Sequence, residues 1–321
     1  MIILEDTKEN IAKGADIIRK GGLVAFPTET VYGLGADAFN PSAVAGIFEA
    51  KQRPFFDPLI VHIADITDIE RLTSGIDSRA SRLIERFWPG PLTVVLPKKD
   101  TVPDIVTSGL DTVAVRMPRH ETALSLIREA GTPIAAPSAN RFSCLSPTTS
   151  RHVMEQLGNA VDMILDGGQC TVGIESTIIK ITPAGIHLLR PGGIATEGIE
   201  ECAGEKIITD KTEGKPEAPG QLDYHYSPVK PVIITDDPPL DDERGGFLFF
   251  RKPVSDYPAE RTFILSEKGD LREAAANLFS HLHALDTLNI SRIYAQNVPE
   301  HGLGLGIMDR LKKASMKFKN S

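Results

Sequence analysis

Apolar and polar positions along the first two thirds of the chain recur with the periods of helices and short buried strands. Ile11 and Ile18 lie on one face of an expected amphipathic helix that ends at Gly21-Gly22. Leu23-Val24-Ala25-Phe26 then predicts a buried strand, which Pro27 stops. Further strands are expected at 58–63, 92–96, 113–117, 134–136 and 177–181. Three further helices are expected: one that begins at Asn40-Pro41, one over 79–88 and one over 121–130. This alternation predicts an α/β domain with a mixed sheet.

The alternation returns on a smaller scale near the end of the chain. Strands are expected at 232–234, 246–250 and 292–295, with a long helix at 271–285 and a closing helix at 305–316. The order βββαβα predicts a small, doubly wound sheet. Residues 212–221 lack apolar periodicity and are rich in turn formers, which is typical of a linker or a functional loop. We therefore predict a first domain over 1–205, a linker over 206–230 and a second domain over 231–321.

Length and composition agree with a globular protein of two domains. The chain has 321 residues, 41% apolar and 24% charged, and domains usually contain about 100–200 residues. No stretch approaches the roughly 18 continuous apolar residues of a membrane span, and the N-terminus lacks the pattern of a signal peptide. Cys144, Cys170 and Cys202 are widely spaced, which argues against a zinc knuckle or a disulfide framework and favours a reducing cytoplasm.

The net charge restricts the class of partner. Lys and Arg number 35 and Asp and Glu 43, so the formal net charge is −8. A protein that coats nucleic acid needs surplus cations to neutralise phosphates, and this charge argues against such a role. A local basic pocket for a small anion remains compatible with it.

The segment most informative for chemistry is Phe26-Pro27-Thr28-Glu29-Thr30-Val31-Tyr32-Gly33-Leu34-Gly35. It follows the end of a strand, which is where α/β proteins bind ligands. The hydroxyls of Thr28 and Thr30 can hold a small polar ligand, and Gly33 and Gly35 allow the backbone to approach it. On spacing alone, a plain strand-to-helix turn explains the segment equally well. It does not have the lysine–hydroxyl ending of a Walker A loop.

Several cations form a second group of candidates. Lys51-Gln52-Arg53-Pro54 offers a point charge and a guanidinium fork, as a phosphate clamp would. A solvated helix end also explains this pair, because cations favour the carbonyl end of a helix. Arg116 stands in an apolar strand and Arg190 follows Leu188-Leu189, so both are expected to meet anions such as a carboxylate and a phosphate.

Hydroxyl-rich loops and one histidine complete the candidates. The loops are Pro137-Ser138-Ala139-Asn140, Ser146-Pro147-Thr148-Thr149 and Glu175-Ser176-Thr177. Each of them could equally be a helix cap or a turn. His62 lies in an expected strand, where a histidine is more often a core residue than a catalyst. The His and Asp residues do not have metal-ligand spacing, so a metal cage built by the protein alone is not expected.

Taken together and in this order, the segments resemble the YrdC/Sua5 family. The strings that carry the resemblance are PTETVYGLG, K-x-R-P, D-P-L-I-V-H-I, W-P-G-P-L-T, V-R-M-P, P-S-A-N, S-P-T, G-I-E-S-T-I and L-R-P-G-G. Leu285-Asp286, Arg292-Ile293-Tyr294-Ala295 and the run GLGLGIMDRL over 302–311 are similar to the C-terminal domain of the long Sua5 form. The resemblance implies a YrdC-like twisted mixed sheet with flanking helices, followed by a small Rossmann-like α/β domain.

The resemblance implies threonylcarbamoyl-AMP synthase activity. The family joins L-threonine, bicarbonate and ATP to give threonylcarbamoyl-AMP, diphosphate and water. A separate transferase then uses the product to make threonylcarbamoyladenosine at position 37 of tRNA. Mg²⁺ would enter with ATP and be held mainly by phosphates and water. Direct contact with tRNA or a membrane is not expected, which agrees with the acidic charge.

The resemblance also implies residue roles. L-threonine would contact Thr30, His62, Arg116, Ala136 and Ser176. ATP would contact Lys51, Arg53, Asp57, Thr112, Ser138, Asn140, Ser146, Arg190 and Tyr226, with Lys51 and Arg53 as the catalytic cations. The linker string Pro219-Gly220 with His225-Tyr226-Ser227-Pro228 resembles a lid that folds over the nucleotide site.

Two features depart from the family pattern, and two other functions stay open. Leu222-Asp223-Tyr224 stands where basic residues are common, and Asp57 stands where asparagine is usual. An acid beside ATP would repel phosphate unless Mg²⁺ or a cation offsets it. One alternative is a double-stranded RNA-binding module, which the charge disfavours. The other is a different enzyme that handles a carbamoyl-adenylate, although such enzymes usually carry zinc or acyl-phosphatase modules.

Overall fold

The computed structural model describes residues 2–209, 216–222 and 226–317 and places them in two α/β units. The first unit holds an eleven-stranded mixed sheet in the order β1-β8-β2-β3-β7-β4-β6-β5-β9-β10-β11. Its strands are β1 (Ile2–Glu5), β2 (Val24–Phe26), β3 (Gly33–Asp37), β4 (Ile60–His62), β5 (Leu92–Pro97), β6 (Thr112–Arg116), β7 (Ile134–Ala135), β8 (Met163–Asp166), β9 (Thr177–Thr182), β10 (Gly185–Arg190) and β11 (Ile207–Ile208). Its helices are α1 (Lys8–Arg19), α2 (Pro41–Lys51), α3 (Ile69–Leu72), α4 (Ser78–Phe87), α5 (Asp104–Thr107), α6 (Glu121–Ala130), α7 (Ser150–Leu157) and α8 (Thr196–Ala203).

A capping residue begins α2, and a left-handed residue follows its end. The Asn40 side chain accepts hydrogen bonds from the backbone N–H groups of Ser42 and Ala43, which confirms the predicted N-cap. The helix ends at Lys51, and Gln52 takes the left-handed conformation with φ 53°. The chain therefore turns sharply between Lys51 and Arg53.

The strand pairing brings distant segments to one edge of the first sheet. β4 and β6 are parallel, with His62 opposite Arg116 at their carboxyl ends. β5 runs antiparallel to β6, so its first residues reach the same edge, where Leu92 pairs with Thr177 of β9. Arg190 ends β10 opposite Ile178. The candidate residues at the ends of these strands are thus neighbours in space.

The second unit contains a four-stranded parallel sheet in the order β12-β15-β13-β14. Its elements are β12 (Val232–Ile234), β13 (Gly245–Phe249), β14 (Thr262–Ile264), α9 (Leu271–Thr287), β15 (Arg292–Ala295) and α10 (Gly304–Met316). The predicted order βββαβα is confirmed. Both helices pack in one apolar cluster with Leu248 and Ile293, so they lie on the same face of the sheet.

The helices are therefore not divided between two faces, as the predicted doubly wound sheet requires. The segment between β13 and β14 forms only the short 3-10 turn Ala259–Arg261. On that face of the sheet, the aromatic side chains of Phe247, Phe249 and Tyr294 pack with Tyr257. An aromatic loop thus takes the place of a helix.

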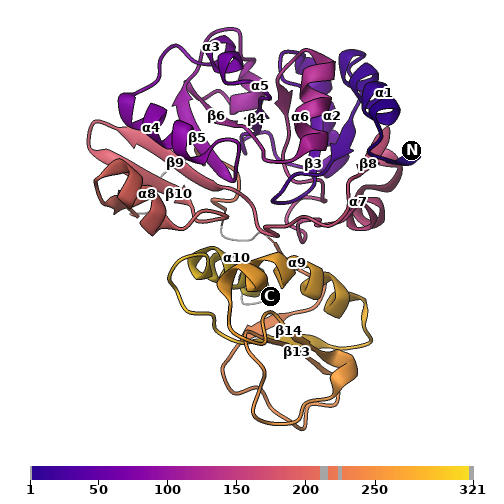
Figure 1. Cartoon of the computed structure of the whole chain (residues 1–321). Helices are drawn as coiled ribbons and strands as arrows, with labels where there is room; N and C mark the ends of the chain where they lie inside the picture. Colours follow the sequence, from indigo (N-terminus) through magenta and orange to yellow (C-terminus); the bar gives the residue numbers. More distant parts are fainter. Residues whose placement is uncertain (1, 210–215, 223–225, 318–321) are drawn as a thin grey trace.

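The helices of the second unit face the first unit, and Figure 1 shows α9 and α10 at the junction. Their apolar cluster includes Val31, Leu145 and Ile174 from the first unit, so the two units share a core. No helix of the described segments is long and apolar enough to cross a membrane. Cys144, Cys170 and Cys202 are free thiols.

Candidate active site

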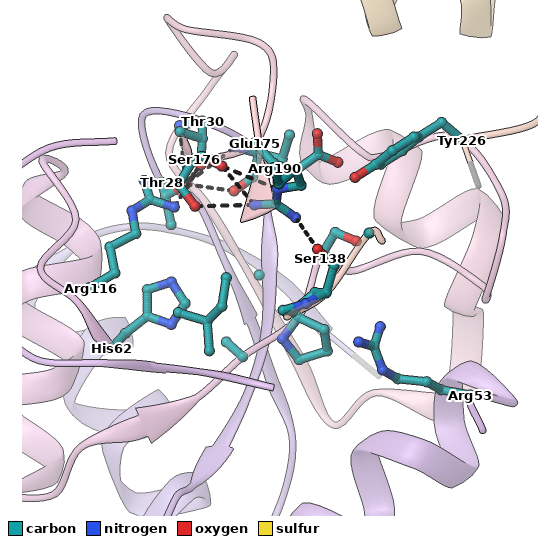
Figure 2. Close-up of a pocket in the computed structure, with 17 residues that line it drawn as sticks. Thr28, Thr30, Arg53, His62, Arg116, Ser138, Glu175, Ser176, Arg190 and Tyr226 are labelled. Carbon is teal, nitrogen blue, oxygen red and sulfur yellow. Dashed lines mark hydrogen bonds between the residues drawn. The ribbon is translucent and has the colours of Figure 1, made fainter. Parts of the chain in front are cut away.

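A pocket lies at the sheet edge where β4 and β6 end and β9 begins. Its empty volume is about 500 Å³, including space at its open mouth. It brings together the predicted residues Thr30, Arg53, His62, Arg116, Ala136, Ser138, Ser176, Arg190 and Tyr226, most of them labelled in Figure 2. The remaining lining residues are Thr28, Val31, Gly33, Ile60, Pro137, Glu175, Pro219 and Gly220. Residues predicted for L-threonine and for ATP therefore line one pocket.

The loop after β2 is a closed turn built on Thr28. The Thr28 hydroxyl accepts hydrogen bonds from the N–H groups of Thr30 (3.1 Å) and Val31 (3.2 Å) and donates to the Val31 carbonyl (2.7 Å). Gly33 lines the pocket as expected, but Gly35 does not. A Cβ at Gly35 would lie 2.7 Å from side-chain atoms of Phe26 and Ile134. Close packing within the sheet, and not approach to a ligand, requires glycine there.

Arg116 is buried and held from three sides. Nη1 donates to the Thr30 hydroxyl at 2.9 Å and Nε donates to the Gly90 carbonyl at 3.2 Å. Nη2 lies 2.7 Å from Oε2 of Glu29, an ion pair without hydrogen-bond geometry. The anionic partner expected for Arg116 is thus Glu29 within the protein, a residue that the sequence did not single out. Nη2 keeps a proton that can be donated to a ligand.

His62 stands beside Arg116 in the wall of the pocket. Burial, together with the Arg116 charge, lowers the pKa of His62 to about 3, so the imidazole is neutral at neutral pH. Its Nδ1 is buried and has no hydrogen-bond partner among the described residues. A neutral imidazole with an unused ring nitrogen can donate to or accept from a bound polar group.

Arg190 carries a buried charge that pairs with no carboxylate in the described part of the chain. Nη2 donates to the Ser176 carbonyl (2.9 Å) and hydroxyl (3.1 Å), and Nη1 donates to the Pro219 carbonyl (3.2 Å). The Ser176 hydroxyl lies 2.7 Å from that of Thr93, which fixes its position. Arg190 is thus oriented by neutral groups, and its charge is available to an anion.

Lys51 and Arg53 are both buried, so the alternative of a solvated helix end is wrong. Lys51 Nζ donates to the carbonyls of Ser138 (2.6 Å) and Asn140. Arg53 Nη2 lies 2.9 Å from Oδ2 of Asp57 and donates to the Pro58 carbonyl at 2.9 Å. Burial and the neighbouring Arg53 lower the pKa of Lys51, whereas burial raises the pKa of Asp57 despite the two cations.

Five predicted residues do not line the pocket: Lys51, Asp57, Thr112, Asn140 and Ser146. Thr112 begins β6, four residues before Arg116. The Asn140 amide donates to the Arg141 (2.7 Å) and Cys144 (2.9 Å) carbonyls and so shapes its own loop. Thr149, rather than Ser146, caps the helix that follows. The contacts of these five residues with ATP stay predictions.

Sequence reasoning gave no role to the charges of Glu175 and Arg310, although both lie in segments that it singled out. Glu175 lines the pocket, and its carboxylate accepts from the Ser146 hydroxyl and from Nε of Arg310 at 3.0 Å. Burial would raise the pKa of Glu175, but Arg310, Arg190 and Ser146 outweigh this effect and lower it, so the carboxylate is ionised. The two residues are 135 positions apart, and no spacing in the sequence indicates their contact.

The linker contributes one side of the pocket. Pro219, Gly220 and Tyr226 are buried and line it. Ala218 is fully buried in an apolar cluster with Ile60, Val95, Ala114 and Ile178 of the sheet. His225 and the non-basic residues Asp223 and Tyr224 lie outside the described residues. The described part of the linker therefore lies against the sheet beside the pocket, and its role as a lid stays a prediction.

The side chains around the pocket indicate how Mg²⁺ could be bound there. Within residues 2–209, 216–222 and 226–317, no group of three or more His, Cys, Asp or Glu side chains could hold a metal ion. The carboxylates of Glu29, Asp57 and Glu175 each pair with an arginine. An ion in this pocket would therefore take its ligands mainly from bound phosphates and water.

Comparisons with known proteins agree with this geometry. The family model of the Sua5, YciO and YrdC proteins, described as telomere recombination, matches residues 16–192. A second model, described as the threonylcarbamoyl-AMP synthase C-terminal domain, matches residues 194–316. Threonylcarbamoyl-AMP synthases of Pyrococcus abyssi and Bacillus subtilis are 46% and 43% identical over 97% of this chain and 95% and 94% of their own lengths. The crystal structure of P. abyssi Sua5 complexed with L-threonine has a TM-score of 0.91 and 43% identity, and the match covers 98% of both chains. The chain therefore belongs to the YrdC/Sua5 family, in the long, two-domain form of the threonylcarbamoyl-AMP synthases.

Proposed function

We propose that this protein is a threonylcarbamoyl-AMP synthase, which converts L-threonine, bicarbonate and ATP to threonylcarbamoyl-AMP, diphosphate and water. The observation that carries the proposal is a buried pocket with an excess of cations. Arg53 and Arg116 pair with carboxylates, whereas Arg190 and Lys51 contact only carbonyl and hydroxyl oxygens among the described residues. Buried charges without a counter-charge are costly, so the pocket is suited to an anionic ligand.

One end of the pocket suits the amino acid. Arg116 is fixed by Thr30 and Glu29 and can donate from Nη2 to a carboxylate. The neutral His62 and the Ser176 hydroxyl line the same pocket, and Ala136 leaves room beside them. The P. abyssi relative has been solved in complex with L-threonine, which supports L-threonine as the amino acid that this protein uses.

The other end suits the triphosphate. Arg190 and Arg53 line the pocket near Ser138 and Tyr226, and Lys51 lies behind Ser138. The threonine amine first adds bicarbonate to give a carbamate, with loss of water. A carbamate oxygen then attacks the α-phosphorus, and diphosphate leaves. The step needs positioning and neutralisation of phosphate charge, not a protein nucleophile. Mg²⁺ bound to the phosphates would add to that neutralisation.

The test is the dependence of diphosphate release on both co-substrates. Purified protein incubated with ATP and Mg²⁺ should release diphosphate only when threonine and bicarbonate are both present. Serine in place of threonine and bicarbonate-depleted buffer serve as controls. ATP turnover that is indifferent to threonine would refute the proposal. Transfer of the product to a separate tRNA-modifying transferase and a cytoplasmic location stay predictions.

A further inference from the structure

We propose that Arg310 of the second domain is a positioning residue of the nucleotide pocket, which neutralises Glu175 and holds Tyr226 in the pocket wall. The inference rests on the proposed function, because it concerns the binding of ATP. It gives the C-terminal domain a defined part in the active site, although none of its described residues lines the pocket.

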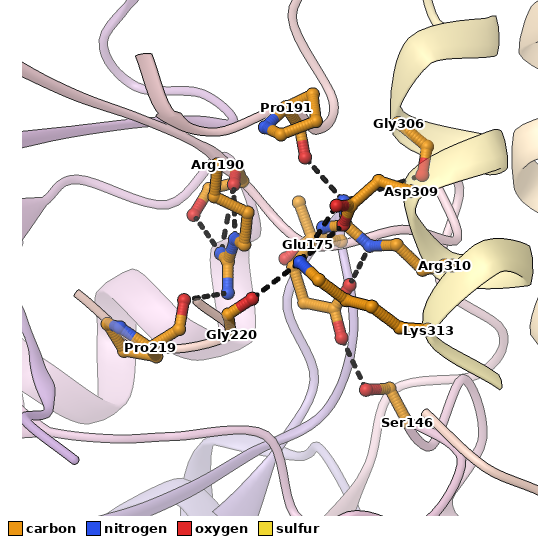
Figure 3. A network of polar contacts seen from close by, with 12 residues as sticks. Ser146, Glu175, Arg190, Pro191, Pro219, Gly220, Gly306, Asp309, Arg310 and Lys313 are labelled. Atoms are coloured by element: carbon orange, nitrogen blue, oxygen red, sulfur yellow. Dashed lines mark hydrogen bonds and ion pairs between the residues drawn. The ribbon is translucent and has the colours of Figure 1, made fainter. Parts of the chain in front are cut away.

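Arg310 reaches across the boundary between the domains. It lies on α10 and is fully buried, an unusual environment for a cation. Its Nε donates to Oε2 of Glu175 at 3.0 Å, and its Nη1 donates to the carbonyl of Pro191, the residue after Arg190 (Figure 3). The Ser146 hydroxyl donates to the other oxygen of Glu175. Glu175 is thus held by one partner from each domain.

The same guanidinium supports Tyr226. Its central carbon lies 5.1 Å from the centroid of the Tyr226 ring, within the range of a cation–π contact. Phe279 of α9 packs against the same ring at 5.7 Å between centroids. Tyr226 has a left-handed backbone with φ 60°, which is costly for a residue other than glycine. The packing against the second domain stabilises this conformation.

A second cation on α10 holds the neighbouring linker segment. Lys313 Nζ donates to the Gly220 carbonyl at 2.6 Å and pairs with Asp309 at 2.8 Å. Gly220 is close to the nucleotide side of the pocket, since a Cβ there would lie 3.0 Å from Cδ of Arg190. One face of α10 therefore contacts three lining residues: Glu175, Tyr226 and Gly220.

The charge on Glu175 explains why Arg310 is needed. Without Arg310, the Glu175 carboxylate would lose its ion-pair partner and would face the pocket beside Arg190, a cation that pairs with no carboxylate of the described residues. Glu175 would then attract Arg190 and repel phosphate oxygens. Arg116 and His62, at the amino-acid end, make no contact with Arg310 in the described structure. Loss of Arg310 should therefore weaken ATP binding selectively.

The test uses the full-length chain and the variants Arg310→Met, Glu175→Gln and the double variant. Arg310→Met should raise the KM for ATP about tenfold or more, with the KM for threonine changed less than about twofold. The double variant should recover most of the ATP affinity, because the neutral Gln needs no counter-charge. Lys312→Ala is the matched control, since Lys312 lies on the same helix, is half exposed and pairs with Glu300, away from the pocket lining.

Three results would overturn the inference. They are a parallel rise of both KM values, a double variant no better than Arg310→Met, and an ATP affinity that Arg310→Met leaves unchanged. If Arg310→Met does not fold, Glu175→Gln decides, because it removes the carboxylate and leaves the Arg310 charge in place, so the KM for ATP should fall. An unchanged or higher KM for ATP would contradict the proposal. Wild-type protein that releases no diphosphate with threonine and bicarbonate would refute the proposed function instead.

Discussion

His62 and Arg116 lie directly opposite each other at the carboxyl ends of two neighbouring parallel strands. This register places a neutral imidazole next to a guanidinium in a buried wall. Burial is the larger cause of the low pKa of His62, about 3, and the Arg116 charge adds to it. Folding therefore holds His62 in its uncharged form.

The stability of the protein should depend on pH through His62. The His62 pKa is about 3 in the folded chain against 6.5 without perturbation, so the unfolded chain binds more protons between these values. The free energy of unfolding should fall as the pH decreases from about 6.5, by up to about 1.4 kcal/mol per pH unit from this residue. Urea unfolding at pH 7, 6 and 5 measures the slope. His62→Gln should reduce it, and an unchanged slope would contradict the assignment. The same slope measured for His152→Gln serves as a comparison, because burial lowers the pKa of His152 to about 3 as well.

Replacing Lys51, at the end of α2, or Arg53, just after it, should impair the reaction. Lys51→Ala and Arg53→Ala remove charge from the proposed phosphate site, so kcat/KM for ATP should fall by about 100-fold or more. Diphosphate release at varied ATP measures this, with thermal unfolding as a check on folding. Lys206→Ala and Arg151→Ala are matched controls, since both side chains are more than 80% exposed. Activity within about twofold of wild type would reject the phosphate role.

If Arg53 binds phosphate as proposed, Asp57 would compete with that phosphate for the guanidinium. Asp57→Asn removes the carboxylate that lies 2.9 Å from Arg53 Nη2, so ATP should bind several-fold more tightly. The ligand-free protein should lose stability, because Arg53 keeps its buried charge without a partner. Calorimetric titration with a non-hydrolysable ATP analogue and thermal unfolding measure the two effects. Weaker analogue binding would mean instead that the Asp57 carboxylate contacts the ligand or its Mg²⁺.

Gly220 tests the linker without changing any charge. Gly220→Ala introduces a Cβ 2.7 Å from the Tyr226 hydroxyl and 3.0 Å from Arg190, so it should displace both and raise the KM for ATP. Gly204→Ala is the control, because Gly204 has a similar positive φ (74° against 81°) but open space around it. Both variants should lose about 1 kcal/mol of stability from backbone strain. Equal KM values in the two variants would show that the linker does not position the nucleotide.

The sequence predicts the fold best where apolar periodicity and caps are strong. The strand around Val61 and the start of α2 at Asn40 are examples, and both are confirmed. β1 was missed because Ile2 and Ile3 are largely exposed on a short edge strand and show no alternation. The arrangement of helices in the second domain was wrong because strand order alone does not determine which face a connection covers.

For the site too, residues with a local sequence signal were predicted, whereas contacts between distant segments were not. Arg116 and Arg190 were identified because a charge at the end of an apolar strand needs a partner. The carboxylate that pairs with Arg116 was not predictable, because Glu29 lies in a loop whose turn is closed by Thr28. The pairing of Glu175 with Arg310 was not predictable either, because Arg310 lies in another domain. Buried ion pairs of this kind depend on how elements meet in space, which composition and spacing do not encode.

The shared apolar cluster makes the two domains one thermodynamic unit. Val31, Leu145 and Ile174 of the first domain are buried against α9 and α10 of the second, so separating the domains would expose apolar surface on both. Calorimetry should show a single heat-absorption peak rather than two. A fragment ended at the linker would expose this patch to water and would be prone to aggregate. The first domain therefore depends on the second to cover its apolar junction. Substitutions on one side of this junction are expected to require compensating substitutions on the other side.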